Sequence, residues 1–483
     1  MRKVFLHISL LFSCVVGAQS AVEWQQTYGG PGVEVGYSVK SCLDQGYIVV
    51  GTTSTSGPSD GYIVRTDSLG LVMWTKTYGG VNVDILQSVE LLSDSGFIAA
   101  GYTNSRGNGG YDGWILRLDK NGDTLWTKTF GTLDWDFFYD VAVTKDSGFV
   151  FVGGTYGTGN GDEDMLFLKL DSLGNFQWVQ TYGGAKQDEA QSVTVLGDST
   201  IASCGFTYSQ SDTLGDSWIL DVDEVNGALI WDTTAHFYGQ PDKAFGISNY
   251  PLYGLIYVCG SRETSPGNDD PYISIWQYNG DSLLSSTFGG AQDEILYDAV
   301  TRPEGTVGCV GTNYTVGGGN GDVTLFHTVN WQSPTFGTFS LDQGYGIDVT
   351  HDGGYIMCGL TEGYGAFQSN LYLIKTDTFG NTSSVLAVRE PVISDFGTKV
   401  YPNPASDIIT ITLDHPTANG NNFQLEIVDV TGRAISSVDS WSNIGATTSQ
   451  TKVDISAFDN GIYFYRISGE DNIVHTGSFS VSH

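Results

Sequence analysis

Residues 74–103 read WTKTYGGVNVDILQSVELLSDSGFIAAGYT, and this stretch holds the pattern that decides the fold. An aromatic segment ends in the glycine pair Gly79-Gly80, and two apolar segments follow on either side of Asp94-Ser95-Gly96. Short apolar segments bounded by Asp, Asn and Gly are typical of β-strands joined by tight hairpins. The stretch therefore predicts three successive short strands.

The same pattern returns along the chain. The first glycines of the turns that end the aromatic segments are Gly29, Gly79, Gly131, Gly183, Gly239 and Gly289, at spacings of 50, 52, 52, 56 and 50 residues. One unit contains four strand-like segments, for example residues 86–92, 97–103, 113–119 and 123–130. A period of roughly 40 to 50 residues with four strands indicates the blades of a β-propeller.

The third segment of the unit occurs seven times, which predicts seven blades. The last repeat has no fourth segment with a tryptophan, whereas the chain begins with a spare one at Trp24–Tyr28. We therefore expect an all-β fold, with a seven-bladed propeller of four-stranded blades over residues 19–385 and a ring closed by the N-terminal strand. Residues 22–385 resemble the glycine-rich propeller repeats of exported bacterial proteins, and they lack the kelch and WD40 signatures.

The N-terminus has the features of an export signal. Arg2 and Lys3 precede an apolar stretch over residues 4–16, and Val16-Gly17-Ala18 offers small residues for cleavage. This pattern predicts a signal peptide over residues 1–18, with lipid attachment at Cys14 as the alternative. No later apolar stretch reaches about 18 residues, so we expect no transmembrane helix in the mature chain.

The formal net charge of −33 and a pI near 4.2 limit the partners. Such a surface repels phosphate backbones, so we expect no nucleic-acid partner. The charge also favours a monomer that stays in solution. Cations, neutral glycans and protein partners remain open.

Five cysteines follow the predicted signal peptide. Cys204, Cys259 and Cys358 each directly precede a glycine, and Cys309 lies one place earlier in its repeat. Such positions indicate small core residues. Because matching positions on neighbouring repeats are expected to be too far apart for a bond, we expect no disulfides.

The pattern changes after Asn381. Residues 386–398 are expected to be a linker, and residues 399–483 contain the alternating segment 408–413 together with several short motifs. These motifs resemble the type A sorting domain of the type IX secretion system of Bacteroidetes. The resemblance rests on Tyr401, Pro402, Asn403 and Pro404, on Gly432 and Arg433 in the sequence VTGR, and on Gly461 and Tyr463 in the sequence NGIY. It implies a small Ig-like β-sandwich over residues 399–483, recognition by the type IX machinery, and a secreted or cell-surface protein. An ordinary fibronectin-like module is the alternative.

Acidic residues repeat in the loop that leads from the fourth strand of one blade to the first strand of the next. They are Glu34, Asp84, Asp136, Asp188, Asp242, Asp293 and Asp342. In a four-stranded propeller these loops share a face with the loops between the second and third strands, so we expect the seven carboxylates around the mouth of the central channel. One interpretation is that each carboxylate caps its own turn. The other is that the carboxylates bind calcium, a sugar or a cationic ligand, with Trp135 in one such loop as a sugar platform.

Catalytic signals are weak. Histidines are scattered without metal-ligand spacing, and no nucleophile elbow or phosphate loop is present. We therefore identify no catalytic residues, no cofactor other than possible calcium, and no defined metal site. The preferred hypothesis is an exported binding or scaffold protein that presents an acidic face to a glycan, cation or protein. The alternative is a carbohydrate-active hydrolase or lyase that uses paired carboxylates at the channel mouth.

Overall fold

The computed structural model describes residues 23–382 and 398–483, with gaps at 56, 198, 211–213, 236–239, 317–319, 329–332, 365–367, 415–422, 429–433, 439, 444–447 and 469–472. The predicted signal peptide and nearly all of the predicted linker lie outside the described residues. Within the described residues every regular element is a strand, and no helix is long and apolar enough to cross a membrane. The all-β prediction is confirmed.

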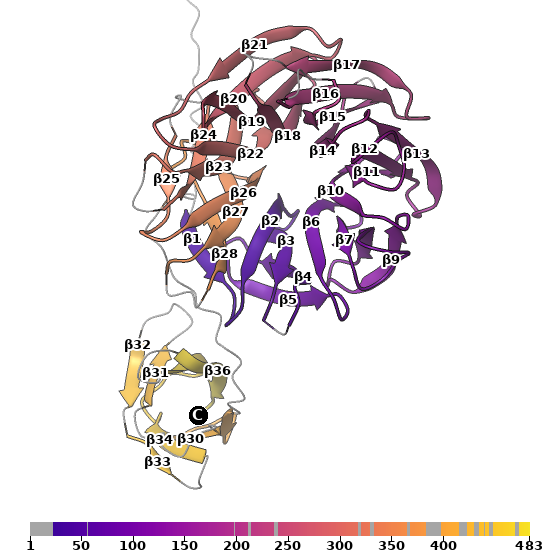
Figure 1. The fold of residues 1–483 in the computed structure, drawn as a ribbon. Coiled ribbons are helices and arrows are strands. Elements are labelled where there is room, and N and C mark those ends of the chain that lie inside the picture. The colour runs from indigo at the N-terminus through magenta and orange to yellow at the C-terminus, as the bar shows by residue number, and fades with distance from the viewer. Residues whose placement is uncertain are drawn as a thin grey trace, which may run out of the picture. The chain divides into compact units, whose positions relative to one another are not determined.

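Seven antiparallel sheets, each of four strands, are arranged around a central axis in the described part of the chain (Figure 1). The innermost strands, called strands A, are β2 (Glu34–Ser41), β6 (Asp84–Leu91), β10 (Asp136–Val143), β14 (Asp188–Val195), β18 (Asp242–Tyr250), β22 (Glu294–Thr301) and β26 (Asp342–Val349). Strands B are β3 (Tyr47–Thr53), β7 (Phe97–Thr103), β11 (Phe149–Thr155), β15 (Thr200–Thr207), β19 (Leu255–Ser265), β23 (Val307–Asn313) and β27 (Tyr355–Thr361). Blades one to seven follow this order.

The two outer strands complete each blade. Strands C are β4 (Asp60–Thr66), β8 (Asp112–Leu118), β12 (Asp164–Leu170), β16 (Asp216–Asp223), β20 (Asn268–Gln277), β24 (Asp322–His327) and β28 (Asn370–Lys375). Strands D of blades one to six are β5 (Val72–Tyr78), β9 (Thr124–Phe130), β13 (Phe176–Tyr182), β17 (Leu229–Ala235), β21 (Ser282–Thr287) and β25 (Thr335–Phe336). Strands B and C are almost entirely buried because both of their faces pack against neighbouring blades.

The N-terminal strand β1 (Trp24–Tyr28) is the outer strand of blade seven. The strand order of that sheet is β1-β28-β27-β26, so the first and last strands of the ring pair side by side (Figure 1). The Tyr372 hydroxyl of β28 donates to Gln25 Oε1, and Trp24 is 1% exposed. The predicted ring closure is confirmed.

A tryptophan in an outer strand packs on the C–D turn of the next blade. An added Cβ at Gly122 would lie 2.8 Å from Trp74 Cη2, and Gly122 has a φ of 77°. Only glycine meets both conditions without strain. The same contact joins Trp24 to Gly70, Trp126 to Gly174, Trp178 to Gly227 and Trp231 to Gly280. The repeated tryptophan and the repeated turn glycine are therefore two halves of one contact between blades.

The D–A and B–C loops share one face of the propeller, as predicted. In six of the seven blades the residue that follows strand B donates its backbone N–H to the residue just before strand A; for example, Tyr156 N donates to Trp135 O at 2.8 Å. In blade five the donor, Glu263, lies within strand B and bonds Pro241 O at 3.0 Å. The next blade is attached in the same region, where Asp188 N donates to Glu163 O at 2.7 Å. These bonds hold the loops of neighbouring blades in a fixed relation.

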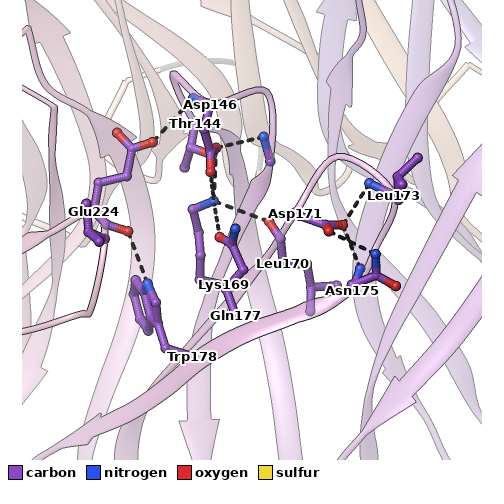
Figure 2. Close-up of polar contacts among 12 residues, drawn as sticks. Thr144, Asp146, Lys169, Leu170, Asp171, Leu173, Asn175, Gln177, Trp178 and Glu224 are labelled. Atoms are coloured by element: carbon purple, nitrogen blue, oxygen red, sulfur yellow. Dashed lines mark hydrogen bonds and ion pairs between the residues drawn. The ribbon is translucent and has the colours of Figure 1, made fainter.

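The opposite face carries a repeated ion pair between strand C and the A–B turn. In blade three the fully buried Lys169 Nζ lies 2.9 and 3.0 Å from the Asp146 oxygens and 2.8 Å from Gln177 Oε1 (Figure 2). Thr144 Oγ1 donates to Asp146 Oδ1 at 2.5 Å. The equivalent pairs are Arg65–Asp44, Arg117–Asp94 and Lys375–Asp352. A buried cation in these blades is thus neutralised by the aspartate of its own turn.

We expect Asp146→Asn to lower the free energy of unfolding by about 2 kcal/mol at pH 7, because the buried Lys169 then lacks a carboxylate. Burial by itself would raise the pKa of Asp146, but hydrogen bonds from Thr144 and Lys169 outweigh it and lower the pKa to about 2 from 3.8. The ionised carboxylate therefore stabilises the fold above about pH 4, and this stabilisation disappears as the pH falls toward 2.

Urea unfolding at pH 7 and at pH 2.5 checks the prediction, since the difference between Asp146→Asn and the wild type should shrink at the lower pH. Asp171→Asn is the matched control: Asp171 accepts the Leu173 and Asn175 amides in an exposed turn and contacts no buried cation (Figure 2). An equal loss of stability at both pH values would contradict the ion-pair explanation.

The C-terminal unit is a β-sandwich, which confirms the predicted fold. One sheet has the order β29-β30-β34-β33 and the other β32-β31-β35-β36. The strands are β29 (Thr398–Tyr401), β30 (Ile408–Asp414), β31 (Gln424–Val428), β32 (Ala434–Val438), β33 (Ser442–Asn443), β34 (Thr448–Asp454), β35 (Gly461–Ser468) and β36 (Ile473–Val481). Ile409, Ile411 and Leu413 alternate into a core shared with Leu425 and Ile427.

The sorting motifs occupy different environments in this sandwich. Tyr401, Pro402, Asn403 and Pro404 are exposed, and Asn403 Oδ1 accepts both the Ser480 N–H and the Ser480 hydroxyl at 2.9 Å. Gly461 is exposed. Tyr463 is buried, and its hydroxyl donates to Asp459 O at 3.0 Å. Gly432 and Arg433 lie outside the described residues.

Candidate functional site

Each strand A begins with a carboxylate, and the structure encloses all seven. These seven residues are at most 2% exposed: Glu34, Asp84, Asp136, Asp188, Asp242, Glu294 and Asp342. Blade six corrects the predicted set, because Glu294 and not Asp293 holds the first position of the strand. The carboxylates stand where the D–A loops end, each as the first residue of a strand A, and they are too enclosed to form an open negative ring around the channel.

Hydrogen bonds explain why these acidic side chains turn inward. Asp136 Oδ2 accepts the Thr132 N–H at 2.6 Å and the Thr132 hydroxyl at 3.0 Å, while Oδ1 accepts the Thr155 hydroxyl at 2.6 Å. Asp84 bonds in the same way to Gly80 N and to the Thr103 and Ser105 hydroxyls. In these two blades the carboxylate thereby joins its D–A turn to the end of strand B, which is the capping role of an Asx side chain. In blade five Asp242 Oδ1 accepts from Arg262 Nε at 2.5 Å.

A second carboxylate, at the start of strand C, approaches the same turn. An added Cβ at Gly131 would lie 2.2 Å from Asp112 Oδ1 and 2.9 Å from Asp136 Oδ2. Equivalent carboxylate pairs flank Gly79, Gly183, Gly289 and Gly337. Burial raises the pKa of Asp112, and the nearby charge of Asp136 raises it further. The first glycine of the repeated turn is thus required by the close approach of two acids.

Carboxylate pairs of this kind are oxygen ligands suited to a hard cation. No group of three or more His, Cys, Asp or Glu side chains that could hold a metal ion occurs among the residues that the structure describes. Calcium binding therefore stays a prediction, as does ligand contact by the seven residues of the predicted set.

The central channel is lined by residues that the sequence prediction did not select. In every strand A the register of pairing with strand B shifts after the third residue, which leaves the fourth residue as a β-bulge. The bulge residues are Tyr37, Gln87, Tyr139, Gln191, Phe245, Tyr297 and Tyr345, and they line one cavity of about 230 Å³. Because a bulge redirects its side chain, seven equivalent bulges create a collar of side chains around the axis.

The collar is mainly aromatic. Ring centroids lie 5.5 Å apart for Tyr37 and Tyr345, 5.2 Å apart for Tyr297 and Tyr345, and 5.5 Å apart for Phe245 and Tyr297. Burial raises the pKa of Tyr37 and of Tyr297 to about 12, so these hydroxyls stay neutral. The collar therefore offers flat apolar rings with hydroxyl donors at their edges.

Small polar residues lie directly below the collar and connect the blades. Asp140 accepts the Ser88 hydroxyl of blade two at 2.6 Å, and from blade four the Ser192 hydroxyl at 2.9 Å and Val193 N at 2.8 Å. Asp298 accepts Ile347 N of blade seven at 3.0 Å. Burial raises the pKa of Asp298 to about 7. These bonds fix the positions of strands A and hence the shape of the collar.

A polar cluster lies beside the collar on blades three and four. The Gln187 side-chain amide donates to Glu163 Oε2 at 2.9 Å and to Glu189 Oε2 at 3.2 Å. The Tyr156 hydroxyl donates to Glu163 Oε2 at 2.9 Å, and the amide of the collar residue Gln191 donates to Glu189 Oε1. Burial raises the pKa of both carboxyls, and the Glu163 charge raises that of Glu189 further. The pair therefore tends to retain a proton near neutral pH.

Trp135 extends this cluster to the surface. It is 51% exposed, and its ring centroid lies 5.9 Å from Tyr156, 5.9 Å from Tyr111 and 6.3 Å from Phe137. Phe137 in turn stacks on the collar residue Tyr139 at 5.9 Å with an angle of 9° between the ring planes. A continuous aromatic surface thus runs from the exposed Trp135 to the channel. We call Trp135, Tyr156, Glu163, Gln187, Glu189 and the collar the mouth site.

Sequence reasoning found Trp135 but missed the rest of the mouth site. A signal for the collar was present: in six of the seven blades the bulge residue stands eight positions after the first turn glycine, for example Tyr37 after Gly29 and Tyr139 after Gly131. It is followed by Ser, Asp or Gly in all seven blades. Glu189 has no acidic counterpart in the other strands A, and Glu163 has one only in Asp269 of blade five, so no pattern repeated in every blade identifies them.

These observations define the class of protein: a seven-bladed β-propeller with a C-terminal β-sandwich. Residues 399–481 match the family described as the secretion system C-terminal sorting domain. The resemblance drawn from the sorting motifs is thereby confirmed, and the chain is secreted through the type IX system to the cell surface or the extracellular space.

No curated protein sequence matches the chain. Among solved structures it is similar to the WD40 propeller domain of Doa1, with 14% identity, 72% of this chain and 95% of that chain covered, and a TM-score of 0.46. It is also similar to PorZ, a surface component of the type IX secretion system of Porphyromonas gingivalis (12% identity, 90% and 58% covered, TM-score 0.40). A third is the propeller domain of the Trilobed protease from Pyrococcus furiosus (10% identity, 73% and 95% covered, TM-score 0.40). These likenesses concern the fold alone.

Proposed function

We propose that the chain is an exported binding protein whose mouth site takes a neutral, hydroxyl-rich ligand such as an oligosaccharide. The observation that carries this proposal is the continuity of the half-exposed Trp135 with the aromatic collar, beside the hydrogen-bonding array of Glu163, Gln187 and Glu189. Aromatic faces stack on the apolar faces of sugar rings, while amides and carboxyls bond their hydroxyls. Delivery outside the cell, where glycans are abundant, agrees with this ligand class.

Binding without turnover is the preferred form of the proposal. Hydrolases that use two carboxyls hold them roughly 5–10 Å apart so that each acts separately. Glu163 and Glu189 instead interact directly and share the Gln187 amide. Such a pair behaves as one acid that holds a proton. It can form a hydrogen bond with a ligand hydroxyl, but it is poorly suited to hydrolysis, in which one carboxyl must act as the acid and the other as the base. The sorting domain supplies the second partner, the type IX secretion machinery.

The mature protein, tested on an array of neutral oligosaccharides, is expected to bind saturably. We expect Trp135→Ala to raise the Kd about tenfold or more, because an exposed aromatic anchor carries a large share of binding energy. Isothermal titration with the best oligosaccharide measures the change. Reducing-end release, measured on the same oligosaccharide, is expected to stay at background.

Phe339→Ala is the matched control. Phe339 is an 87% exposed apolar residue of the D–A loop that leads into blade seven, at the position that Leu133 holds in the loop of Trp135. It should leave the Kd unchanged. Equal losses for the two variants, or no saturable binding to any oligosaccharide, would contradict the proposal. Release of reducing ends would favour the hydrolase alternative.

A further inference from the structure

Two cysteines of neighbouring blades face one another in the core. Cys259 lies on β19 of blade five and Cys309 on β23 of blade six, and they are 0% and 1% exposed. Both belong to the buried cluster that contains Ile273 of blade five and Leu296 of blade six. Burial raises the pKa of the Cys259 thiol, and the neighbouring Cys309 thiol raises it further. The five described cysteines are free thiols in the structure.

A one-residue offset brings the two thiols together. Cys259 directly precedes Gly260, whereas Cys309 stands two places before Gly311. Because successive side chains of a strand point to opposite faces, the offset turns Cys309 toward blade five. Gly308, the residue before Cys309, faces the opposite way, since an added Cβ at Gly308 would meet Tyr355 of blade seven. This confirms that Cys309 faces blade five. The expectation of no disulfides concerned matching positions on neighbouring repeats, and Cys309, one place earlier in its repeat, does not occupy a matching position.

The backbones of the two blades also come unusually close here. Cys259 pairs with Gly246 of β18, and Cys309 pairs with Ala299 of β22. An added Cβ at Gly246 would lie 2.7 Å from Asp298 Cα and 2.9 Å from Ala299 N. The glycine thus allows the inner strands to touch, and the two cysteines lie one strand further out from this point of contact.

We propose that Cys259 and Cys309 are joined by a disulfide in the exported protein. Two thiols lose two protons and two electrons to form the S–S bond, and the disulfide of a thiol–disulfide oxidoreductase takes them up as two thiols. Exported proteins meet such oxidants outside the cytoplasm. Because burial raises the pKa of the Cys259 thiol, the folded pair reacts poorly, and the bond forms before blades five and six close.

The Cys259–Cys309 disulfide would stabilise blade six, which has the shortest outer strand. In the described residues, β25 of blade six contributes two residues, which pair with Val323 and Thr324 of β24. A link between Cys259 and Cys309, which are 50 positions apart in the sequence, restricts the unfolded chain and so favours the folded ring. Blade six would then be held by its neighbour as well as by its own hydrogen bonds.

Alkylation of the protein secreted by its native host tests the proposal. The protein is denatured without reductant, treated with iodoacetamide and analysed by mass spectrometry. We expect alkylation of Cys42, Cys204 and Cys358 only, together with a cross-linked peptide pair containing Cys259 and Cys309. Alkylation of all five cysteines, or a disulfide with another pairing, would overturn the proposal.

Two variants separate the bond from general effects on folding. Cys204→Ala should retain the cross-link, whereas Cys309→Ala should free Cys259 for alkylation. Unfolding and refolding with reductant should lower the melting temperature of the Cys204→Ala variant by roughly 5 °C and leave that of Cys309→Ala unchanged. An equal response of both variants to reductant would count against the disulfide.

Discussion

Deletion of residues 19–30 is expected to destabilise the propeller far more than the loss of twelve residues from a chain end normally would. The deletion removes β1, so blade seven keeps three strands and β28 becomes an exposed edge. Tyr372 of β28 would then lose its hydrogen bond to Gln25, and the backbone groups of β28 that pair with β1 would face solvent. We expect a loss of about 4 kcal/mol or more, the cost of removing one large buried aromatic such as Trp24, with the bare edge inviting association.

Thermal unfolding of the secreted protein, followed by circular dichroism, measures the effect, and size-exclusion chromatography detects association through the exposed edge. Trp24→Ala should reproduce part of the loss, since it removes the contact with Gly70 and the ring contact with Tyr47. Trp135→Ala is the matched control because its ring is half exposed. An unchanged melting curve for the deletion would contradict closure of the ring by β1.

Truncation after Ser394 is expected to abolish delivery to the cell surface and the medium. The truncation removes the whole of the sandwich that matches the sorting-domain family, residues 399–481, and leaves every strand of the propeller in place. The propeller should therefore fold and accumulate in the periplasm. Cell fractionation with immunoblotting measures the distribution, and a melting curve of the periplasmic protein shows that the propeller is folded.

The control for the truncation is removal of Ser482 and His483 alone, which leaves all eight strands of the sandwich intact. This variant is expected to reach the medium or the surface like the wild type. Normal export of the protein that ends at Ser394 would show that the C-terminal sandwich does not direct secretion.

The mouth site and the Cys259–Cys309 pair share one physical cause. Both depend on strands A and B of adjacent blades lying close enough for side chains to meet across the boundary. The bulge in each strand A turns one side chain toward the axis, and small residues such as Gly246 let neighbouring backbones touch. The close packing of neighbouring blades thus places both the side chains that line the channel and the two cysteines.

The sequence by itself determined the strands, the number of blades and the partner of the spare N-terminal strand. Each of these depends on local signals: apolar segments of strand length, turns such as Asp94-Ser95-Gly96, and a tryptophan and a turn glycine that recur once per blade. The sorting domain could also be identified from the sequence, because its motifs, including Asn403 and Tyr463, occur in a fixed order.

Only the tertiary structure decided which side chains face the channel and which acids are exposed. Asp136 was expected at the channel mouth, but the Thr132 and Thr155 donors draw it inward. Glu163 and Glu189 meet because two blades pack side by side, and their separation in the sequence does not predict the contact. The sequence period shows which side chains of one strand alternate between its two faces. A site built between blades also depends on β-bulges and on how closely the backbones of neighbouring blades approach, and local sequence patterns do not encode these.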